Sequence, residues 1–233
     1  MGFLFYIILG LAICSAVVFI CLSHGQRGLL SLALKSVASF AFISVALVVC
    51  FYKGLSVVGL LIILGLVASI VGDVVLALPD MPEMKKKSEI LTLIGGLAFA
   101  IAHVFYISAM IIRFGFVWWI VIIALVLGLV FCYGNKALGK LDYGKLNAGM
   151  PVYSTFVSLV VAVSLMGLIS GANIYGSIML LVGFVLFWLS DIVLMNIYFG
   201  GHDDKANQKL YYYNLAFYYG AQILIASSLV LLI

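Results

Sequence analysis

Eight long apolar segments constrain this chain more than any other feature of its sequence. A helix needs about 20 mostly apolar residues to cross the hydrocarbon core of a bilayer. Segments of that length follow one another along the chain, with short polar connections between them. They cover residues 3–22, 30–51, 55–78, 90–112, 115–133, 150–170, 174–199 and 211–232. The sequence therefore predicts an all-α integral membrane protein with about eight transmembrane helices.

The charge content supports this fold class. Only 9% of the residues are charged and 67% are hydrophobic, whereas soluble domains carry about 25% charged residues. No segment is long enough to form a separate soluble domain, so residues 1–233 are predicted to be one transmembrane domain. The net charge of +4 is explained by basic connections beside a membrane, and it gives no indication of a nucleic-acid partner.

The basic residues predict how the chain is oriented. Connections on the cytoplasmic side of a membrane are enriched in Lys and Arg. The connections after the first, third, fifth and seventh helices hold nine basic residues, whereas the other side holds only Lys53 and Arg113. The nine are Arg27, Lys85, Lys86, Lys87, Lys136, Lys140, Lys145, Lys205 and Lys209. We therefore expect these connections in the cytoplasm and both termini outside, in the cell (cytoplasmic) membrane.

Two aspartates lie inside predicted spans, in closely similar local sequences. Asp73 and Asp191 each have a glycine eight residues earlier, at Gly65 and Gly183, a small residue immediately before them and aliphatic residues after them. A carboxylate at the centre of a membrane helix costs roughly 2.5–3.5 kcal/mol on insertion scales. Residues that are this costly usually mark a functional site, and two in matched contexts strengthen that interpretation.

The similarity between the two aspartate helices extends to neighbouring helices. His103 follows Asp73, and Gln222 follows Asp191, at separations along the chain that differ by a single position. Lys35-Ser36 precedes Asp73 at the same separation at which Tyr153-Ser154 precedes Asp191. This spacing predicts two copies of a four-helix unit, residues 1–112 and 113–233. Because four is an even number, the two repeats are expected to be parallel in the membrane.

Several polar residues in the predicted spans share helix faces. Side chains three or four positions apart lie on one face of a helix. The sets are His103 with Tyr106, Tyr219 with Gln222, and Ser31 with Lys35 and Ser39. Together with the two aspartates they predict a polar pocket that opens toward the cytoplasmic interface. The alternative is a structural ion pair of Lys35 with one aspartate, surrounded by interhelical hydrogen bonds.

The sequence carries no signal for a metal or a cofactor. The four cysteines, Cys14, Cys21, Cys50 and Cys132, lie in or at the ends of spans and show no zinc-binding spacing. The sequence also has no phosphate-binding loop and no Gly-x-Ser-x-Gly nucleophile motif. We expect neither metal nor cofactor.

The order of these motifs resembles the YhhN-like family of multi-pass lysoplasmalogenases. The matching pieces are Gly72–Leu76 with Pro79, Gly96–Tyr106, Met150–Tyr153, Ser190–Leu194 and Tyr219–Ser227. One departure is that the family tends to have Lys-Pro where this chain has Lys35-Ser36. The resemblance implies hydrolysis of the vinyl ether bond of lysoplasmalogens, giving a fatty aldehyde and a glycerophospho-alcohol that carries choline or ethanolamine, without a metal or an organic cofactor.

The resemblance also points to Asp73 and Asp191 as the acid and base. Vinyl ether hydrolysis needs a proton on the distal alkene carbon and then capture of an oxocarbenium-like cation by water. A buried carboxyl can supply the proton, and an ionised partner can stabilise the cation. The sequence leaves open which aspartate does which. The predicted substrate-binding residues are Lys35, His103, Tyr106, Tyr153, Tyr219 and Gln222, with lysophospholipid and membrane lipids as partners.

Two other functional classes remain open on the sequence. Parallel repeats with paired intramembrane acids also occur in small transporters and proton-coupled carriers. Such carriers often have discontinuous helices, but the two aspartate spans contain no proline. A lipid-binding membrane protein without catalytic activity is the third interpretation. Head-group preference and oligomeric state do not follow from the sequence.

Overall fold

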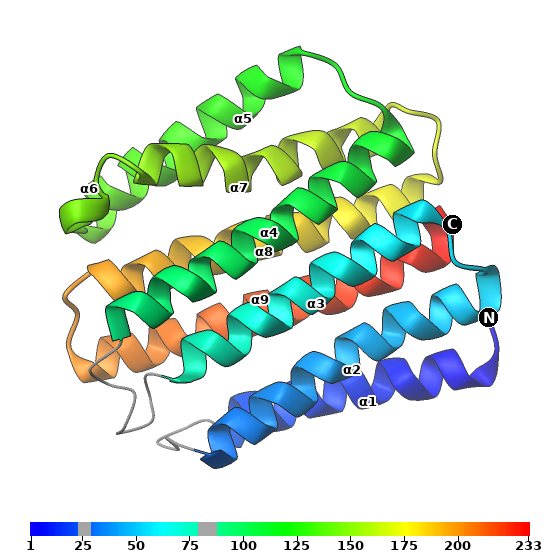
Figure 1. Cartoon of the computed structure of the whole chain (residues 1–233), viewed down its shortest axis with the longest axis horizontal. Coiled ribbons are helices and arrows are strands. Elements are labelled where there is room, and N and C mark those ends of the chain that lie inside the picture. The colour runs from blue at the N-terminus through cyan, green and yellow to red at the C-terminus, as the bar shows by residue number, and fades with distance from the viewer. Residues whose placement is uncertain (23–28, 79–87) are drawn as a thin grey trace. The chain divides into compact units, whose positions relative to one another are not determined.

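The structure is a computed structural model that describes residues 1–22, 29–78 and 88–233. All regular secondary structure in these residues is helical, without a strand among them (Figure 1). Eight helical spans of the described residues are long and apolar enough to cross a membrane. The predicted all-helical class with eight spans is therefore confirmed.

The elements follow one another as α1 (Phe3–Leu22), α2 (Leu29–Lys53), α3 (Val57–Ala77), α4 (Ser88–Phe114), α5 (Trp119–Leu129), η3 (Val130–Gly134), α6 (Asn135–Gly139), η4 (Gly144–Leu146), α7 (Met150–Ser164), η5 (Leu165–Leu168), α8 (Ile174–Phe199) and α9 (Asp204–Leu232). Most observed bounds lie within about two residues of the prediction, and two spans differ by more. The fifth continues through Gly134 and Asn135 to Gly139, because α5, the π-helical η3 and α6 form one continuous rod. The last begins at Asp204, where polar residues extend the helix beyond its apolar part.

The chain divides into two compact units. Unit 1 comprises Met1–Ala109 and Ile225–Ile233, and unit 2 comprises Met110–Leu224. Most of α4 therefore belongs to unit 1, and most of α9 belongs to unit 2. The two four-helix repeats, residues 1–112 and 113–233, stay a prediction.

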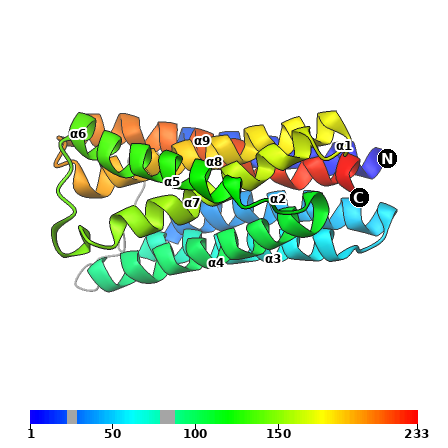
Figure 2. The same cartoon turned by 90° about the horizontal axis from the view of Figure 1, so that it is seen from above.

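In unit 1, glycines bring α3 and α4 into close contact. The backbone at Gly65 lies against the ring of Tyr106, and Gly72 lies against the ring of Phe99. A Cβ at either glycine would overlap the ring, so larger residues would separate the helices. Figure 2 shows α3 and α4 side by side along this part of unit 1. The contact positions α4 next to Asp73, which directly follows Gly72 on α3.

Both chain termini lie at the same end of unit 1. Gly2 lies against the ring of Tyr52 near the end of α2. The neighbouring Lys53 Nζ donates a hydrogen bond of 3.0 Å to the carbonyl of Ile233. The side of the membrane on which this end lies stays a prediction, and Arg27 and Lys85–Lys87, which contribute to it, lie outside the described residues.

In unit 2, α7 packs against both α5 and α8. Gly128 of α5 lies directly on the backbone of Thr155 in α7, where a Cβ would clash. Side-chain caps fix where two helices begin. The Asn173 side chain accepts from Gly176 N at 3.1 Å at the start of α8, and Asp203 accepts from Ala206 N at 2.7 Å at the start of α9. These caps satisfy backbone donors that have no partner within the helix.

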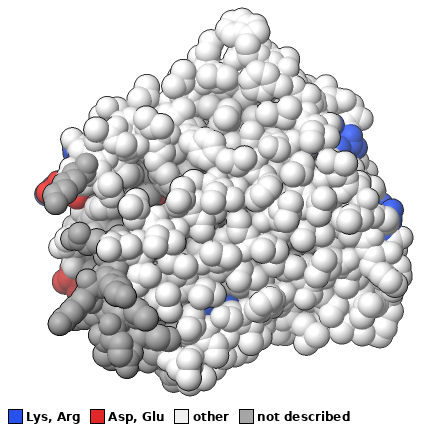
Figure 3. All heavy atoms as spheres, viewed as in Figure 1, with Lys and Arg blue, Asp and Glu red and all other residues white. Residues whose placement is uncertain are grey.

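The outer surface of the spans is apolar. Large hydrophobic side chains such as Phe40, Leu97 and Val126 are exposed. The face drawn in Figure 3 shows few charged atoms between its two ends. A soluble protein rarely exposes so much contiguous apolar surface, whereas lipid-facing helices require it.

The orientation can be tested at the two ends of α8. We expect a cysteine at Ser170 to react with a membrane-impermeant thiol reagent on intact cells, and a cysteine at Lys205 not to react, because basic connections stay in the cytoplasm. Both positions are exposed, and the four native cysteines would be replaced in the background protein. Permeabilised cells provide the control, in which both positions should react. Labelling only at Lys205 in intact cells would invert the predicted orientation.

Candidate functional site

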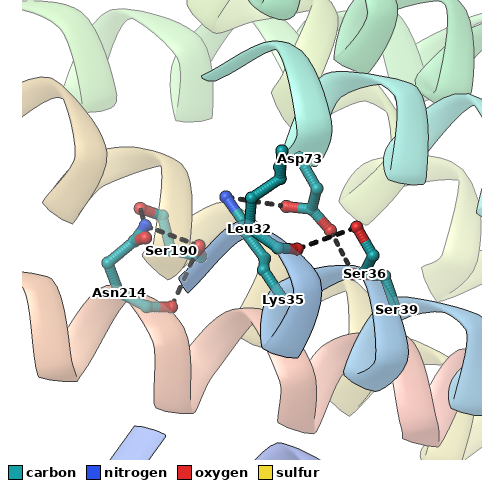
Figure 4. A network of polar contacts seen from close by, with 7 residues as sticks. All are labelled: Leu32, Lys35, Ser36, Ser39, Asp73, Ser190 and Asn214. Atoms are coloured by element: carbon teal, nitrogen blue, oxygen red, sulfur yellow. Dashed lines mark hydrogen bonds and ion pairs between the residues drawn. The ribbon is translucent and has the colours of Figure 1, made fainter. Parts of the chain in front are cut away.

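In unit 1, Asp73 is the centre of a buried polar cluster. Asp73 is 3% exposed, near the end of α3. Lys35 Nζ lies 3.4 Å from its Oδ1, and Ser39 Oγ donates a 2.7 Å hydrogen bond to its Oδ2 (Figure 4). Both carboxyl oxygens therefore have a partner, and one of these partners carries a positive charge.

The helical period of α2 explains why Lys35 and Ser39 reach the same carboxyl. They are four residues apart and lie on one face of the helix. Ser36, on a neighbouring face, instead donates to the carbonyl of Leu32 in its own helix at 2.9 Å. Ser39 is fully buried, so its hydroxyl supports the carboxyl without access to bulk water. The face of α2 that carries Lys35 and Ser39 is therefore directed toward the Asp73 carboxyl. Ser36, on another face, forms its hydrogen bond within α2.

His103 and Tyr106 lie on α4 and are fully buried. The Tyr106 hydroxyl lies 3.4 Å from Ser69 Oγ, one helical turn before Asp73 on α3. His103 Nδ1 lies 2.7 Å from the carbonyl of Phe99. A carbonyl only accepts hydrogen bonds, so Nδ1 carries the proton in this contact. Tyr106 is thus held by a contact with α3, and His103 is held by a hydrogen bond within α4.

In unit 2, Asp191 is equally buried but has different surroundings. Asp191 is 2% exposed, on α8. The Tyr153 hydroxyl, from α7, interacts with its carboxyl group. Its Oδ2 is buried and forms no hydrogen bond with the described part of the chain. Within the same residues, no Lys or Arg forms an ion pair with it.

The helix that carries Asp191 is fastened to α9 at the preceding residue. The Asn214 side-chain amide donates to both the carbonyl and the hydroxyl of Ser190, each at 2.9 Å. The Ser190 hydroxyl lies 3.3 Å from the carbonyl of Asn214 and donates to it (Figure 4). These bonds fix the register of α8 against α9 next to the carboxyl.

Tyr219 and Gln222 lie on α9, close to the part of the helix that Asn214 anchors. Both are almost completely buried, at 1% and 0% exposed. The Tyr219 ring packs edge-on against Tyr218, with 5.2 Å between centroids, and Tyr218 packs against Phe187 of α8 at 5.7 Å. The predicted role of Tyr219 and Gln222 in substrate binding stays a prediction.

Equivalent sequence positions serve the two carboxyl groups. Lys35 precedes Asp73 along the chain at the same separation at which Tyr153 precedes Asp191. Each contacts the aspartate of its own unit from the preceding helix of that unit. The repeat stays a prediction, and the exchange of an ammonium for a phenol makes the surroundings of the two carboxyls chemically unlike. The predicted pairing of Asp73 with Asp191 itself stays a prediction.

Sequence reasoning placed Ser39 on the pocket face of its helix without giving it a role, and it missed Ser69 as a site residue. Ser39 follows Lys35 by four positions, and Ser69 precedes Asp73 by four. This helical spacing was the signal, but apolar membrane helices carry many serines that bond only within their own helix. The described residues contain no cluster of three His, Cys, Asp or Glu side chains that could hold a metal ion.

Comparison with known sequences identifies the family. No match was found among curated proteins or among solved structures. The YhhN family model matches residues 30–229, a range that includes both aspartates and all of their contacts described above. The chain therefore belongs to the YhhN family.

Proposed function

We propose that this protein is a membrane hydrolase that cleaves the vinyl ether bond of lysoplasmalogens. The YhhN family is associated with lysoplasmalogenase activity. The overall reaction adds water to R–CH=CH–O–R′ and releases the aldehyde R–CH2–CHO and the alcohol HO–R′. No oxidant or reductant is needed. The chemistry requires only an acid, a base and a means of stabilising a cation.

The observation that carries the mechanism is the contrast between the two buried carboxyls. Lys35 compensates a negative charge on Asp73, and Ser39 donates to the same group. An opposite charge and a donor both favour the ionised form of a carboxyl. Asp73 thus suits the role of the carboxylate that stabilises the cation and accepts a proton from water.

Asp191 suits the role of the general acid. A buried carboxylate without a counterion is strongly unfavourable, whereas the neutral acid needs none. Asp191 has no ion-pair partner among the described residues, and its Oδ2 forms no hydrogen bond with them. A protonated oxygen of this kind is free to deliver its proton to carbon. Tyr153, which contacts the same carboxyl, would hold its orientation.

The proposed reaction has two stages. Asp191 protonates the distal alkene carbon, and the resulting oxocarbenium ion is stabilised by the Asp73 carboxylate. Water then attacks the cation and gives a proton to Asp73. As the hemiacetal breaks, Asp73 passes this proton to the departing alcohol oxygen and Asp191 takes the proton of the hemiacetal hydroxyl, which releases aldehyde and alcohol and restores both carboxyls. The proposal requires both carboxyls to act on one bound lipid. Lys35, His103, Tyr106, Tyr153, Tyr219 and Gln222 are proposed to bind it.

Turnover by the purified protein in detergent tests the function. The substrates are a lysolipid with a vinyl ether chain, its saturated alkyl ether analogue and its ester analogue. We expect aldehyde from the vinyl ether alone. In deuterated water the aldehyde should carry one deuterium on the carbon next to the carbonyl, because the proton added to the alkene comes from solvent through Asp191.

Other outcomes separate the alternatives. Cleavage of the ester alone would replace the proposal with a lysophospholipase. Detergent micelles have no second compartment, so aldehyde formation there excludes transport as the only activity. If the folded protein turns over none of the three lipids, the hydrolase proposal fails and the carrier hypothesis becomes the leading one.

His103→Gln should retain measurable activity and an unchanged pH–rate profile. The equivalent position of the second repeat is Gln222, which cannot titrate, and His103 is hydrogen-bonded to the Phe99 carbonyl. His103→Leu, which removes every polar atom, is the matched comparison and should be less active. If the pH–rate profile of His103→Gln lost a limb at about pH 6–7, where histidine usually titrates, His103 would instead be the catalytic acid.

A further inference from the structure

A π-helical turn interrupts the fifth span beside the helix that carries Asp191. It covers Val130–Gly134, between α5 and α6. Single π turns inside membrane or soluble helices are rare and often occur at functional sites. Phe131 and Cys132, inside this turn, are both almost completely buried.

The segment after this turn holds α8 on the C-terminal side of Asp191. Asn135 Nδ2 donates to the carbonyl of Ile192 at 3.3 Å, and Asn196 Nδ2 donates to the same carbonyl at 2.8 Å. Asn196 Nδ2 also donates to Asn135 Oδ1 at 2.6 Å. Ile192 directly follows Asp191, so two amide side chains meet at the backbone carbonyl of the next residue after Asp191.

The π turn also holds α8 on the N-terminal side of Asp191. The Phe131 ring packs edge-on against Trp188, with centroids 5.7 Å apart. Trp188 lies three residues before Asp191, and its Nε1 donates to Ser158 Oγ at 2.8 Å. The two anchors thus bracket Asp191 along α8, and they restrict both the rotation and the translation of the helix.

The loop after α6 secures the π turn itself. The buried Tyr143 hydroxyl donates to the carbonyl of Cys132 at 3.3 Å. Burial raises the pKa of Tyr143 to about 12, so the hydroxyl remains a donor at neutral pH. The Cys132 carbonyl also accepts from the backbone N–H of Asn135, so the Tyr143 hydroxyl is a second donor to a carbonyl inside the π turn. The Tyr143 ring packs on Phe199 at the end of α8, with 5.3 Å between centroids.

We infer that Asn135 and Asn196 form a positioning pair that aims the Asp191 carboxyl. This inference rests on the proposed function and deepens it. Oδ2 of Asp191 forms no hydrogen bond with the described residues, so the position of that oxygen depends on the Tyr153 contact with the carboxyl and on where α8 places the Cα of Asp191. A displacement of about 1 Å in a reacting group can cost roughly a hundredfold in rate. The pair therefore acts on kcat, through Asp191, without touching the substrate.

Two glycines of the same rod provide a matched test. A Cβ at Gly139 would collide with Asn196 Oδ1 and, less closely, with the Leu141 side chain, whereas a Cβ at Gly134 would meet only Val130 Cγ1, at 3.9 Å. We expect Gly139→Ala and Asn196→Ala each to lower kcat tenfold to a hundredfold with KM changed less than about twofold. Gly134→Ala should behave as the wild type. Asn135→Ala combined with Asn196→Ala should be no worse than either alone, because paired residues act as one unit.

A second readout does not depend on turnover. Dicyclohexylcarbodiimide modifies protonated carboxyls in apolar surroundings, and mass spectrometry of the α8 peptide would measure its rate of reaction with Asp191 in mildly acidic buffer. We expect Gly139→Ala to change this rate at least threefold and Gly134→Ala to leave it unchanged. Wild-type rates in both assays for Gly139→Ala and Asn196→Ala would overturn the positioning role. Failure of the wild type to cleave any lysolipid would instead reject the proposed function. The carbodiimide modification rates of Asp191 would still test whether Asn135 and Asn196 position its carboxyl.

Discussion

Asp191→Asn should reduce kcat for vinyl ether cleavage by roughly 10²–10⁴-fold, the range expected for loss of a general acid. The amide cannot deliver a proton, but it has nearly the same shape and needs no counterion. The folded state should therefore retain its thermal stability in detergent. The measurement is the initial rate of aldehyde release by the purified variant, together with its thermal unfolding curve.

The solvent-exposed Asp204, in the first turn of α9, supplies the control. Asp204→Asn makes the same chemical change at the surface and should keep wild-type kcat. A stable Asp191→Asn variant with near wild-type turnover would contradict the assignment of the acid. If Asp73→Asn alone abolished turnover, the roles of the two carboxyls would have to be exchanged.

Lys35→Met should both destabilise the protein and remove most of its activity. The substitution leaves a buried Asp73 carboxylate without its counterion, and breaking a buried ion pair from one side typically costs about 3–5 kcal/mol. To avoid this cost Asp73 would become protonated, and a neutral carboxyl cannot stabilise the cation. We expect a lower unfolding temperature and aldehyde release close to background.

The double variant Lys35→Met/Asp73→Asn separates stability from catalysis. Removing both charges leaves no buried ion unpaired, so the unfolding temperature should recover toward the wild type, while turnover should stay at background. Lys53→Met is the matched control, because Lys53 is exposed and bonds the Ile233 carbonyl. A stable and fully active Lys35→Met variant would show that Lys35 only extends toward the membrane interface.

Helix number and type could be predicted from the sequence because they depend on local properties. The length of an apolar segment determines whether it can cross a bilayer, and all eight spans follow from that criterion. The ends of a helix are harder to predict where the terminal residues are neither clearly apolar nor clearly polar. Gly134 and Asn135 have the composition of a connection but lie within a helical rod, because the contact of Asn135 with Asn196 and Ile192 satisfies its side chain.

The candidate site was only partly predictable. The cost of an intramembrane charge identified Asp73, Asp191 and Lys35, since it applies to a residue by itself. The equal separation along the chain related Lys35 to Asp73 and Tyr153 to Asp191 before any contact was known. Sequence spacing could not show that these residues touch.

The sequence by itself determined the membrane class, the eight spans and the few polar residues that apolar helices would not otherwise contain. Only the tertiary structure decided that Lys35 and Ser39 meet Asp73, that Tyr153 meets Asp191, and that a π-helical turn brackets Asp191 through α8. Hydropathy is a sum over one segment, whereas a contact depends on the rotation of each helix about its own axis. That rotation is set by packing between helices, such as the glycine contacts of α3 with α4.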